Sequence, residues 1–204
     1  MAALPKLYAI LDSDCFSKPE DIYSFTRELL SAGVTLLQYR NKRGNARLML
    51  EQARTIKRIS GDSAMLMMND RPDLCLVADF NGCHVGQDDL SPGAARTILG
   101  EKFLLGVSTH NPEQVERAHS TSADYIAVGP VFQTASKANP DPVVGLNGVR
   151  RARELTTKPL VAIGGITRIN CREVIAAGAD CVAVIADLLR EPRRAAAEFL
   201  DLLA

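Results

Sequence analysis

The chain has 204 residues, of which 47% are hydrophobic, and its 24 basic and 24 acidic side chains leave a formal net charge of zero. A single domain, residues 1–204, is the expectation for this length. The balanced charge excludes the basic surface of a nucleic-acid-binding protein, and no segment approaches the roughly 18 continuous apolar residues that a membrane span needs.

Short apolar runs alternate with longer amphipathic segments along the chain. The runs predict strands, in chain order, at Leu7–Leu11, Leu36–Tyr39, Met65–Met68, Gly82–Val85, Phe103–Val107, Tyr125–Val128, Leu160–Ile163 and Cys181–Ile185. The segments after them predict helices at Asp21–Ala32, Ala46–Ile59, Asp73–Ala78, Pro92–Leu99, Pro112–Ser120, Val149–Leu155, Ile169–Ala177 and Pro192–Leu203. Asn111 is a good N-cap for the fifth helix, and Gly178 occupies the position of a C-cap glycine after the seventh helix.

Strict alternation of strands and helices is typical of parallel α/β structure. A closed eight-stranded barrel and an open doubly wound sheet both have this pattern. Eight strand–helix units in a chain of about 200 residues favour closure, because an open sheet of this size usually has fewer strands. The sequence therefore predicts a (β/α)8 TIM barrel.

One segment, between Gly129 and the helix near Val149, interrupts this rhythm and has no clear periodicity. Loops longer than about 12–15 residues are usually functional or disordered. In a barrel this loop follows the sixth strand and lies on the catalytic face. We expect it to be a lid that covers the substrate.

Chemically capable residues follow most of the strands, where the active site of a barrel is found. Gln38, Arg40 and Lys42 occupy alternate positions at the end of the second strand, and alternate residues of a strand share a side. They would aim an amide and two cations at one point, which suits a phosphorylated ligand. The alternative is a basic rim on the protein surface.

Asn69-Asp70 follows the third strand and Asp89 follows the fourth. Carboxylates on neighbouring strand ends are suited to hold one Mg2+, whose other ligands are substrate phosphate and water. Asn69, Asp70 or Asp89 alone would more often cap a helix, and Asp88 competes with Asp89. Together, and facing a basic strand, they favour a magnesium site.

Gly164-Gly165 joins the seventh strand to the next helix. Backbone N–H groups at a helix N-terminus bind anions, and the loops after strands seven and eight often form the phosphate site of a barrel. A tight turn without a ligand explains the two glycines equally well. His84 lies inside a strand run and is expected to be packed and hydrogen-bonded rather than catalytic.

The sequence has no Ser/His/Asp or Cys/His arrangement typical of a nucleophile system, so the site is expected to act by positioning and electrostatics. The five cysteines form no C-x-x-C pair. They are expected to be free thiols in a reducing cytosol, and no signal peptide is recognised, so a cytoplasmic location is expected.

The sequence resembles the thiamine phosphate synthase family at stretches that span nearly the whole chain. These are Leu7-Tyr8-Ala9-Ile10-Leu11-Asp12, Gln38-x-Arg40-x-Lys42, Asn69-Asp70-Arg71-x-Asp73-Leu74, His84-x-Gly86-Gln87-x-Asp89-Leu90, Gly106-x-Ser108-x-His110, Asp124-Tyr125-x-x-x-Gly129-Pro130-x-Phe132-x-Thr134-x-Ser136-Lys137 and Ala162-Ile163-Gly164-Gly165-Ile166. Each stretch is modest by itself, but seven in order with compatible spacing make a specific match.

The resemblance implies a (β/α)8 transferase that joins hydroxymethylpyrimidine diphosphate to thiazole phosphate, or to its carboxylated form, and releases pyrophosphate. It implies a dissociative reaction with Mg2+ as cofactor. By position, it implies that the pyrimidine diphosphate is bound by Gln38, Arg40, Lys42 and Asn69, and Mg2+ by Asp70 and Asp89. It implies that Ser108 and Lys137 hold the departing pyrophosphate and help to stabilise its charge. The thiazole phosphate would be bound by Thr134, Ser136, Gly165 and the backbone of Ile185 and Ala186. Arg40, Ser108 and Lys137 are the residues expected to assist catalysis.

Two positions depart from the family pattern. The lid reads Thr134-Ala135-Ser136 where the family usually has Thr-x-Thr, which keeps a hydroxyl group. Ala186 stands where the family often has serine, which weakens thiazole phosphate binding only if a side-chain hydroxyl is used there.

Other functions remain as alternatives. A thiazole tautomerase has the same barrel but does not need the diphosphate and metal residues, and a non-catalytic sensor of phosphate ligands would not need the paired carboxylates. A phosphosugar isomerase or aldolase needs a positioned base or a Schiff-base lysine, and no lysine lies inside a strand run. The expected partners are small phosphorylated substrates, and a homo-oligomer is left open.

Overall fold

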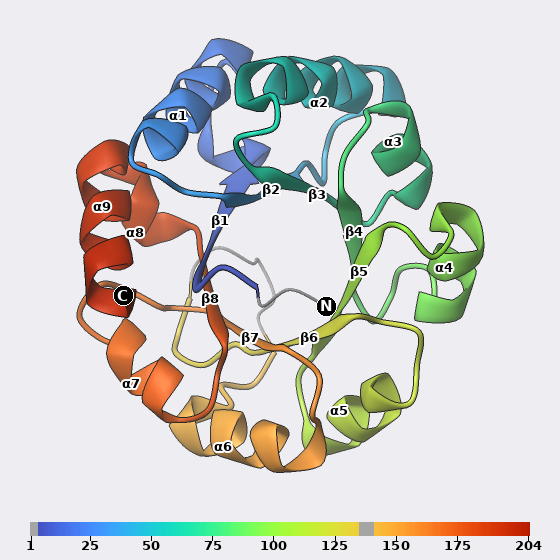
Figure 1. Cartoon of the computed structure of the whole chain (residues 1–204), viewed down its shortest axis with the longest axis vertical. Coiled ribbons are helices and arrows are strands. Elements are labelled where there is room, and N and C mark those ends of the chain that lie inside the picture. Colours follow the sequence, from blue (N-terminus) through green and yellow to red (C-terminus); the bar gives the residue numbers. More distant parts are fainter. Residues whose placement is uncertain (1–3, 135–140) are drawn as a thin grey trace.

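The structure is a computed structural model that describes residues 4–134 and 141–204. Eight parallel strands close into a barrel in chain order, and a ring of helices surrounds them (Figure 1). The strands are β1 Leu7–Asp12, β2 Leu36–Arg40, β3 Met65–Asn69, β4 Gly82–Val85, β5 Leu104–Thr109, β6 Tyr125–Val128, β7 Leu160–Ile163 and β8 Cys181–Val184. The predicted TIM barrel is confirmed.

The helices follow the strands in turn. They are α1 Pro19–Ser31, α2 Ala46–Ser60, α3 Pro72–Val77, α4 Pro92–Leu99, α5 Pro112–His119, α6 Gly145–Leu155, α7 Cys171–Ala176, α8 Ala186–Leu189 and α9 Pro192–Leu203, with a 3-10 turn at Ser13–Cys15. Capping follows the expected chemistry: the Asn111 side chain accepts a hydrogen bond of 2.9 Å from the Gln114 backbone N–H at the start of α5. No helix within the described ranges is both long and apolar enough to cross a membrane.

Strands β1, β2, β3 and β5 continue past their apolar runs into polar residues, so they are longer than predicted. The ladder between β1 and β2 reaches Asp12 opposite Arg40, and the ladder between β3 and β4 reaches Asn69 opposite His84. Backbone pairing does not depend on side-chain polarity, so the ladder extends beyond the hydrophobic core. This extension fixes polar side chains at the carboxyl ends of the strands.

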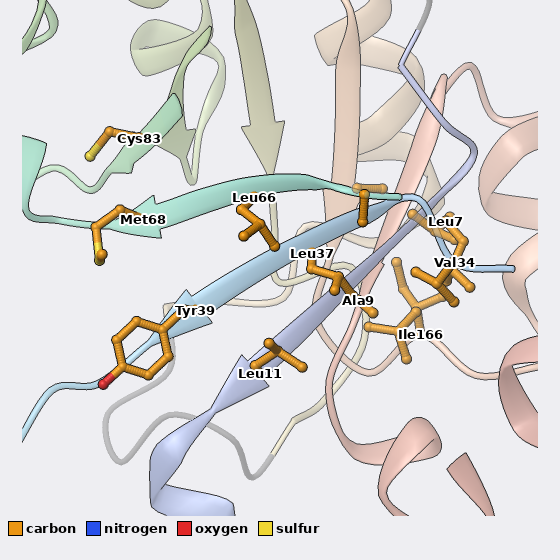
Figure 2. Packing of buried hydrophobic residues seen from close by; sticks show 14 of the residues in the cluster. Leu7, Ala9, Leu11, Val34, Leu37, Tyr39, Leu66, Met68, Cys83 and Ile166 are labelled. Carbon is orange, nitrogen blue, oxygen red and sulfur yellow. The ribbon is translucent and has the colours of Figure 1, made fainter. Parts of the chain in front are cut away.

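Alternate residues of each strand face opposite sides of the barrel wall. Figure 2 shows the outer set, with Leu7, Ala9 and Leu11 of β1 beside Leu37 and Tyr39 of β2. These residues share one cluster with buried residues of the surrounding helices. Each large apolar side chain that is fully buried here contributes about 1.5–3 kcal/mol to stability.

The inner set fills the barrel with a smaller cluster, whose buried members are Tyr8, Ile10, Leu36, Met67, Tyr125, Ala127, Val161, Cys181 and Ala183. It is a packed interior rather than a pore, as in other barrels of this kind. The inward parity that these residues define continues to the ends of the strands. Asp12, Arg40, Asn69, His84 and Ser108 therefore face the same interior as this cluster.

Helix α6 begins at Gly145, four residues before the predicted start at Val149, and two further helical segments differ from the prediction. Helix α7 begins at Cys171 rather than at residue 169, and the short helix α8 was not predicted. The loop before α7 uses its own side chains as partners: Asn170 accepts a hydrogen bond of 2.8 Å from the Thr167 backbone N–H and donates one of 3.1 Å to the Gly165 carbonyl. These bonds satisfy backbone groups outside a helix, and so the helix starts later.

Candidate functional site

Arg40 at the end of β2 is held by an acidic partner that the sequence analysis did not single out. Its Nη1 lies 2.6 Å from Oδ2 of Asp12, the last residue of β1, which is almost completely buried. Burial raises the pKa of Asp12, and the neighbouring Arg40 opposes that rise. One guanidinium nitrogen is thereby anchored, and the other donors of Arg40 make no hydrogen bond within the described residues. Asp12 lies four residues after Tyr8 on the same strand and so faces the barrel interior as Tyr8 does. This alternation is the feature of the sequence from which Asp12 could have been predicted as a site residue.

Lys42, Asp70 and Asp89 form a charged cluster beside Arg40. The Lys42 ammonium pairs with the Asp70 carboxylate and lies 4.0 Å from the nearer oxygen of Asp89. Asp89 is held in place by a hydrogen bond of 2.9 Å that its Oδ2 accepts from the Gly86 backbone N–H. Burial raises the pKa of Asp70 to about 6, and the nearby Asp89 adds to the rise while Lys42 opposes it.

Neither aspartate caps a helix, which was the alternative explanation for both. Helix α3 has Arg71 at its N-cap and no side-chain cap, and α4 is capped by Ser91. Asp88, the competitor of Asp89, is exposed. The two carboxylates of Asp70 and Asp89 therefore have no structural task at a helix end that accounts for their position.

Asn69 lies next to this cluster with its side chain buried. Its amide nitrogen has no hydrogen-bond partner among the described residues. A buried donor without a partner carries a cost of about 1–3 kcal/mol, which a ligand oxygen would relieve. Asn69 is thus a free donor directed into the interior, adjacent in sequence to Asp70.

A chain of hydrogen bonds crosses the inside of the barrel below the charged cluster. The Gln38 amide donates to the Tyr8 hydroxyl over 2.8 Å, and the two tyrosine hydroxyls of Tyr8 and Tyr125 lie 3.2 Å apart. Nδ1 of His84 lies 2.9 Å from the Tyr125 hydroxyl, and its Nε2 lies 2.8 Å from Oγ of Ser108. The chain joins residues of five strands and ends at Ser108.

Burial dominates the protonation of this chain. It lowers the pKa of His84 to about 4, so the imidazole is neutral near pH 7, and it raises the pKa of Tyr8 and Tyr125 well above the usual value. His84 and Tyr125 also stack, with ring centroids 5.5 Å apart. His84 is packed and hydrogen-bonded, but it also contacts a predicted site residue, Ser108, and the sequence did not reveal that contact.

Gly164 and Gly165 pack against the segment after β6. The Phe132 backbone N–H donates to the Gly164 carbonyl over 2.9 Å, and a Cβ at Gly165 would lie 2.4 Å from the Gln133 carbonyl oxygen. Both glycines have positive φ, at 100° and 63°, which favours glycine. Only a residue without a side chain allows this close approach, so the two glycines set the position of the segment that ends at Thr134.

One expectation about these glycines was wrong. Gly165 does not lie at a helix N-terminus, because α7 begins only at Cys171. The helix N-terminus in this region belongs instead to α8, with Ile185 at the N-cap and Ala186 as the first residue. The loop after β7 and a short extra helix after β8 are a common setting for phosphate in barrels.

Some predicted site residues cannot be placed together with the others. Ser136 and Lys137 lie outside the described residues, as does Ala135. Thr134 is half-buried at the end of the described segment. A separate hollow of about 450 Å3 lies on the outside of the barrel and holds none of the predicted site residues; its lining is Glu28, Glu191, Pro192, Arg193, Arg194 and Ala197.

Comparison with known proteins agrees over nearly the whole chain. A family model described as thiamine monophosphate synthase matches residues 7–188. The thiamine-phosphate synthase of Koribacter versatilis is 58% identical over 203 residues, covering 98% of this chain and 96% of that protein. The corresponding protein of Agrobacterium fabrum is 44% identical over 171 residues, covering 81% and 78%. A solved structure, thiamine phosphate pyrophosphorylase from Pyrococcus furiosus, has a TM-score of 0.86 at 32% identity and covers 97% of this chain and 95% of its own.

Proposed function

The chain belongs to the thiamine monophosphate synthase family and is a transferase, and we propose that it joins 4-amino-2-methyl-5-hydroxymethylpyrimidine diphosphate to 4-methyl-5-(2-phosphoethyl)thiazole. The products are thiamine phosphate and pyrophosphate, and the carboxylated thiazole is a further candidate substrate. The observation that carries this proposal is the charged cluster of Lys42, Asp70 and Asp89 at the mouth of the barrel, together with Arg40, which Asp12 holds at the end of β2. Cations alone would serve any phosphate, but a carboxylate pair beside them indicates a metal-bound diphosphate.

The acidic pair fits Mg2+ by its donor chemistry. The two carboxylates are close enough for Asp89 to raise the pKa of Asp70, and a divalent cation bound between them would relieve this repulsion. Among residues 4–134 and 141–204 there is no group of three or more His, Cys, Asp or Glu side chains that would bind a metal alone. Mg2+ is commonly held by one or two carboxylates plus substrate phosphates, so Asp70 and Asp89 would hold it only together with the diphosphate.

The chain's cations take up the charge of the departing group. Arg40 and Lys42, with Lys137 from the segment after β6, would bind diphosphate oxygens, while Gln38 and the unpaired amide of Asn69 orient the pyrimidine part. Ser108 donates to the pyrophosphate as it leaves. Mg2+, when bound, supplies further positive charge against the same oxygens.

The chemistry needs no nucleophile from the protein. In the proposed dissociative reaction pyrophosphate departs first and leaves a pyrimidine-methyl cation, which the thiazole nitrogen then attacks. Thr134, Ser136, Gly165 and the backbone of Ile185 and Ala186 would hold the thiazole phosphate. A single domain over residues 1–204, a cytoplasmic location and a homo-oligomer stay predictions.

The backbone at α8 is expected to make the phosphate contact without a side-chain hydroxyl. Ala186→Ser should therefore leave kcat and the KM for thiazole phosphate within a few fold of the unchanged protein, because the N–H groups at the start of α8 are the same in both. Steady-state kinetics with varied thiazole phosphate measures this. A large gain in affinity would show that a hydroxyl contact is missing and that the backbone alone binds weakly.

The proposed reaction is tested by pyrophosphate release from purified, folded protein. Release should need both substrates and Mg2+, and chelation of Mg2+ should reduce it to background. Release that is absent with both substrates present would contradict the proposal. Conversion of the thiazole alone would then indicate a tautomerase, and binding of the phosphates without conversion would indicate a sensor.

A further inference from the structure

Three residues of the buried hydrogen-bond chain, Tyr8, Tyr125 and His84, have no direct place in the proposed reaction. Gln38, Tyr8, Tyr125 and His84 lie in a row through the barrel interior, with each polar atom within 3.2 Å of the next. All four side chains are at most 8% exposed. A row of polar groups inside an apolar core is costly unless each polar hydrogen is donated to an acceptor. This requirement determines which group donates in each hydrogen bond of the row.

The hydrogen bonds of this chain all run from donor to acceptor in one direction, which the Gln38 amide sets. An amide nitrogen only donates, so the Tyr8 oxygen accepts from Gln38. The other partner of this hydroxyl among the described residues is Tyr125, so the buried hydrogen of Tyr8 is used only if Tyr8 donates to Tyr125. The hydrogen of Tyr125 then points to Nδ1 of His84. A neutral imidazole that accepts at Nδ1 carries its proton at Nε2.

The last step concerns Ser108. Its Oγ accepts from Nε2–H of His84, so the hydrogen of the hydroxyl is not used within the chain. The ring of His84 is neutral because burial disfavours its charged form, and it has an uncharged hydroxyl group at each nitrogen. With the opposite direction, Ser108 would donate to His84 and present only lone pairs to an anion.

We propose that His84 is a positioning residue, held as the Nε2–H tautomer by the chain from Gln38 through Tyr8 and Tyr125, and that it turns the hydroxyl hydrogen of Ser108 toward the diphosphate. The inference rests on the proposed function in one respect, which is that the ligand of Ser108 is the diphosphate. The tautomer itself depends only on the chain.

The two directions predict different protonated nitrogens, which makes the tautomer measurable without substrate. The chain has three histidines, and nitrogen NMR of protein labelled with 15N-histidine records the ring nitrogens of each. The signals of His84 are the ones that disappear in His84→Gln. The expected spectrum has a protonated Nε2 and an unprotonated Nδ1 at pH 7. A protonated Nδ1 would overturn the proposal. In Tyr125→Phe, which keeps the ring but removes the donor to Nδ1, the preference for Nε2–H should weaken.

Kinetics then tests whether His84 acts through Ser108. Ser108→Ala and His84→Leu should each lower kcat by roughly 10- to 100-fold, the loss expected for one hydrogen bond to a charged group. The double variant should be no slower than Ser108→Ala, because both changes remove the same contact. His84→Gln, which can place an N–H near Oγ of Ser108, should recover part of the rate. Additive losses, or no recovery in a folded His84→Gln protein, would mean that His84 is only structural.

A matched control is His119→Gln at the end of α5, where Nδ1 of His119 lies 2.9 Å from the Thr156 hydroxyl. It should leave kcat and KM unchanged. If the unchanged protein releases no pyrophosphate at all, the proposed function fails, and the nitrogen spectrum still decides the direction of the chain.

Discussion

Replacing Asp70 with asparagine is expected to abolish Mg2+-dependent pyrophosphate release and, at the same time, to stabilise the metal-free protein at pH 7. The carboxylate is charged at this pH although burial and Asp89 raise its pKa to about 6. An amide keeps the shape but carries no charge, so the folded protein loses an unfavourable interaction. Asn also suits the backbone here, where φ is 62°, because Asn and Asp tolerate the left-handed region better than other side chains.

The pH dependence follows from the sign of the shift. The folded protein holds the Asp70 proton more tightly than the unfolded chain does, in which the pKa of this carboxyl is near its ordinary value of 3.8. The contribution of Asp70 to stability therefore rises as the pH falls from above 6 toward 3.8, and it is least favourable at neutral pH. Asp70→Asn should remove this dependence. Screening by water and the lost pair with Lys42 limit the expected gain at pH 7 to about 1 kcal/mol.

Urea unfolding of the metal-free proteins between pH 4 and pH 8, together with the pyrophosphate assay, measures both effects. Asp88→Asn is the matched control, because Asp88 is the exposed neighbour of Asp89. It should change neither activity nor the pH dependence. Normal turnover in Asp70→Asn would contradict the magnesium site, and a loss of stability at pH 7 would mean that the pair with Lys42 outweighs burial.

The sequence was sufficient for the fold and for the side of the barrel wall that the polar residues at the strand ends face. Apolar runs of strand length identified all eight strands, and inward parity placed Gln38 and Arg40 on the interior side. The ion pair of Arg40 with Asp12 and the contact of His84 with Ser108 were not predicted. Both depend on the register of neighbouring strands, which one sequence does not state: Asp12 stands opposite Arg40, and Ser108 lies two residues beyond Gly106, the partner of His84.

The loops were harder than the strands for a different reason. Residues before α7 have a helical composition, but Arg168 donates from both its backbone and its side chain to Asp187 in α8. A partner about 20 residues away in the sequence thus competes with the local helix. Side-chain pairs of this kind are invisible to periodicity, and α8 itself, with four residues, is too short to have a periodic signal.

Gly106→Ala is expected to be among the most destabilising single changes in the barrel, although it adds only one methyl group. A Cβ at residue 106 would lie 2.0 Å from Cζ of Tyr125, whose ring is 1% exposed and stacks on His84. The ring cannot move away, because its hydroxyl is fixed between Tyr8 and His84. Overpacking of a rigid core costs about 1–3 kcal/mol and occasionally more, and a contact this short calls for the upper end, about 3 kcal/mol.

The control for Gly106→Ala is Gly93→Ala within α4, where a Cβ would meet nothing within 4 Å. That change should stabilise the protein by about 0.5–1 kcal/mol, because alanine has the higher helix propensity. Urea unfolding compares both with the unchanged protein. In a Tyr125→Ala background the cost of Gly106→Ala should largely vanish, since the obstructing ring is gone. A cost that persists there would show that the strand backbone, rather than the ring of Tyr125, requires glycine at this position.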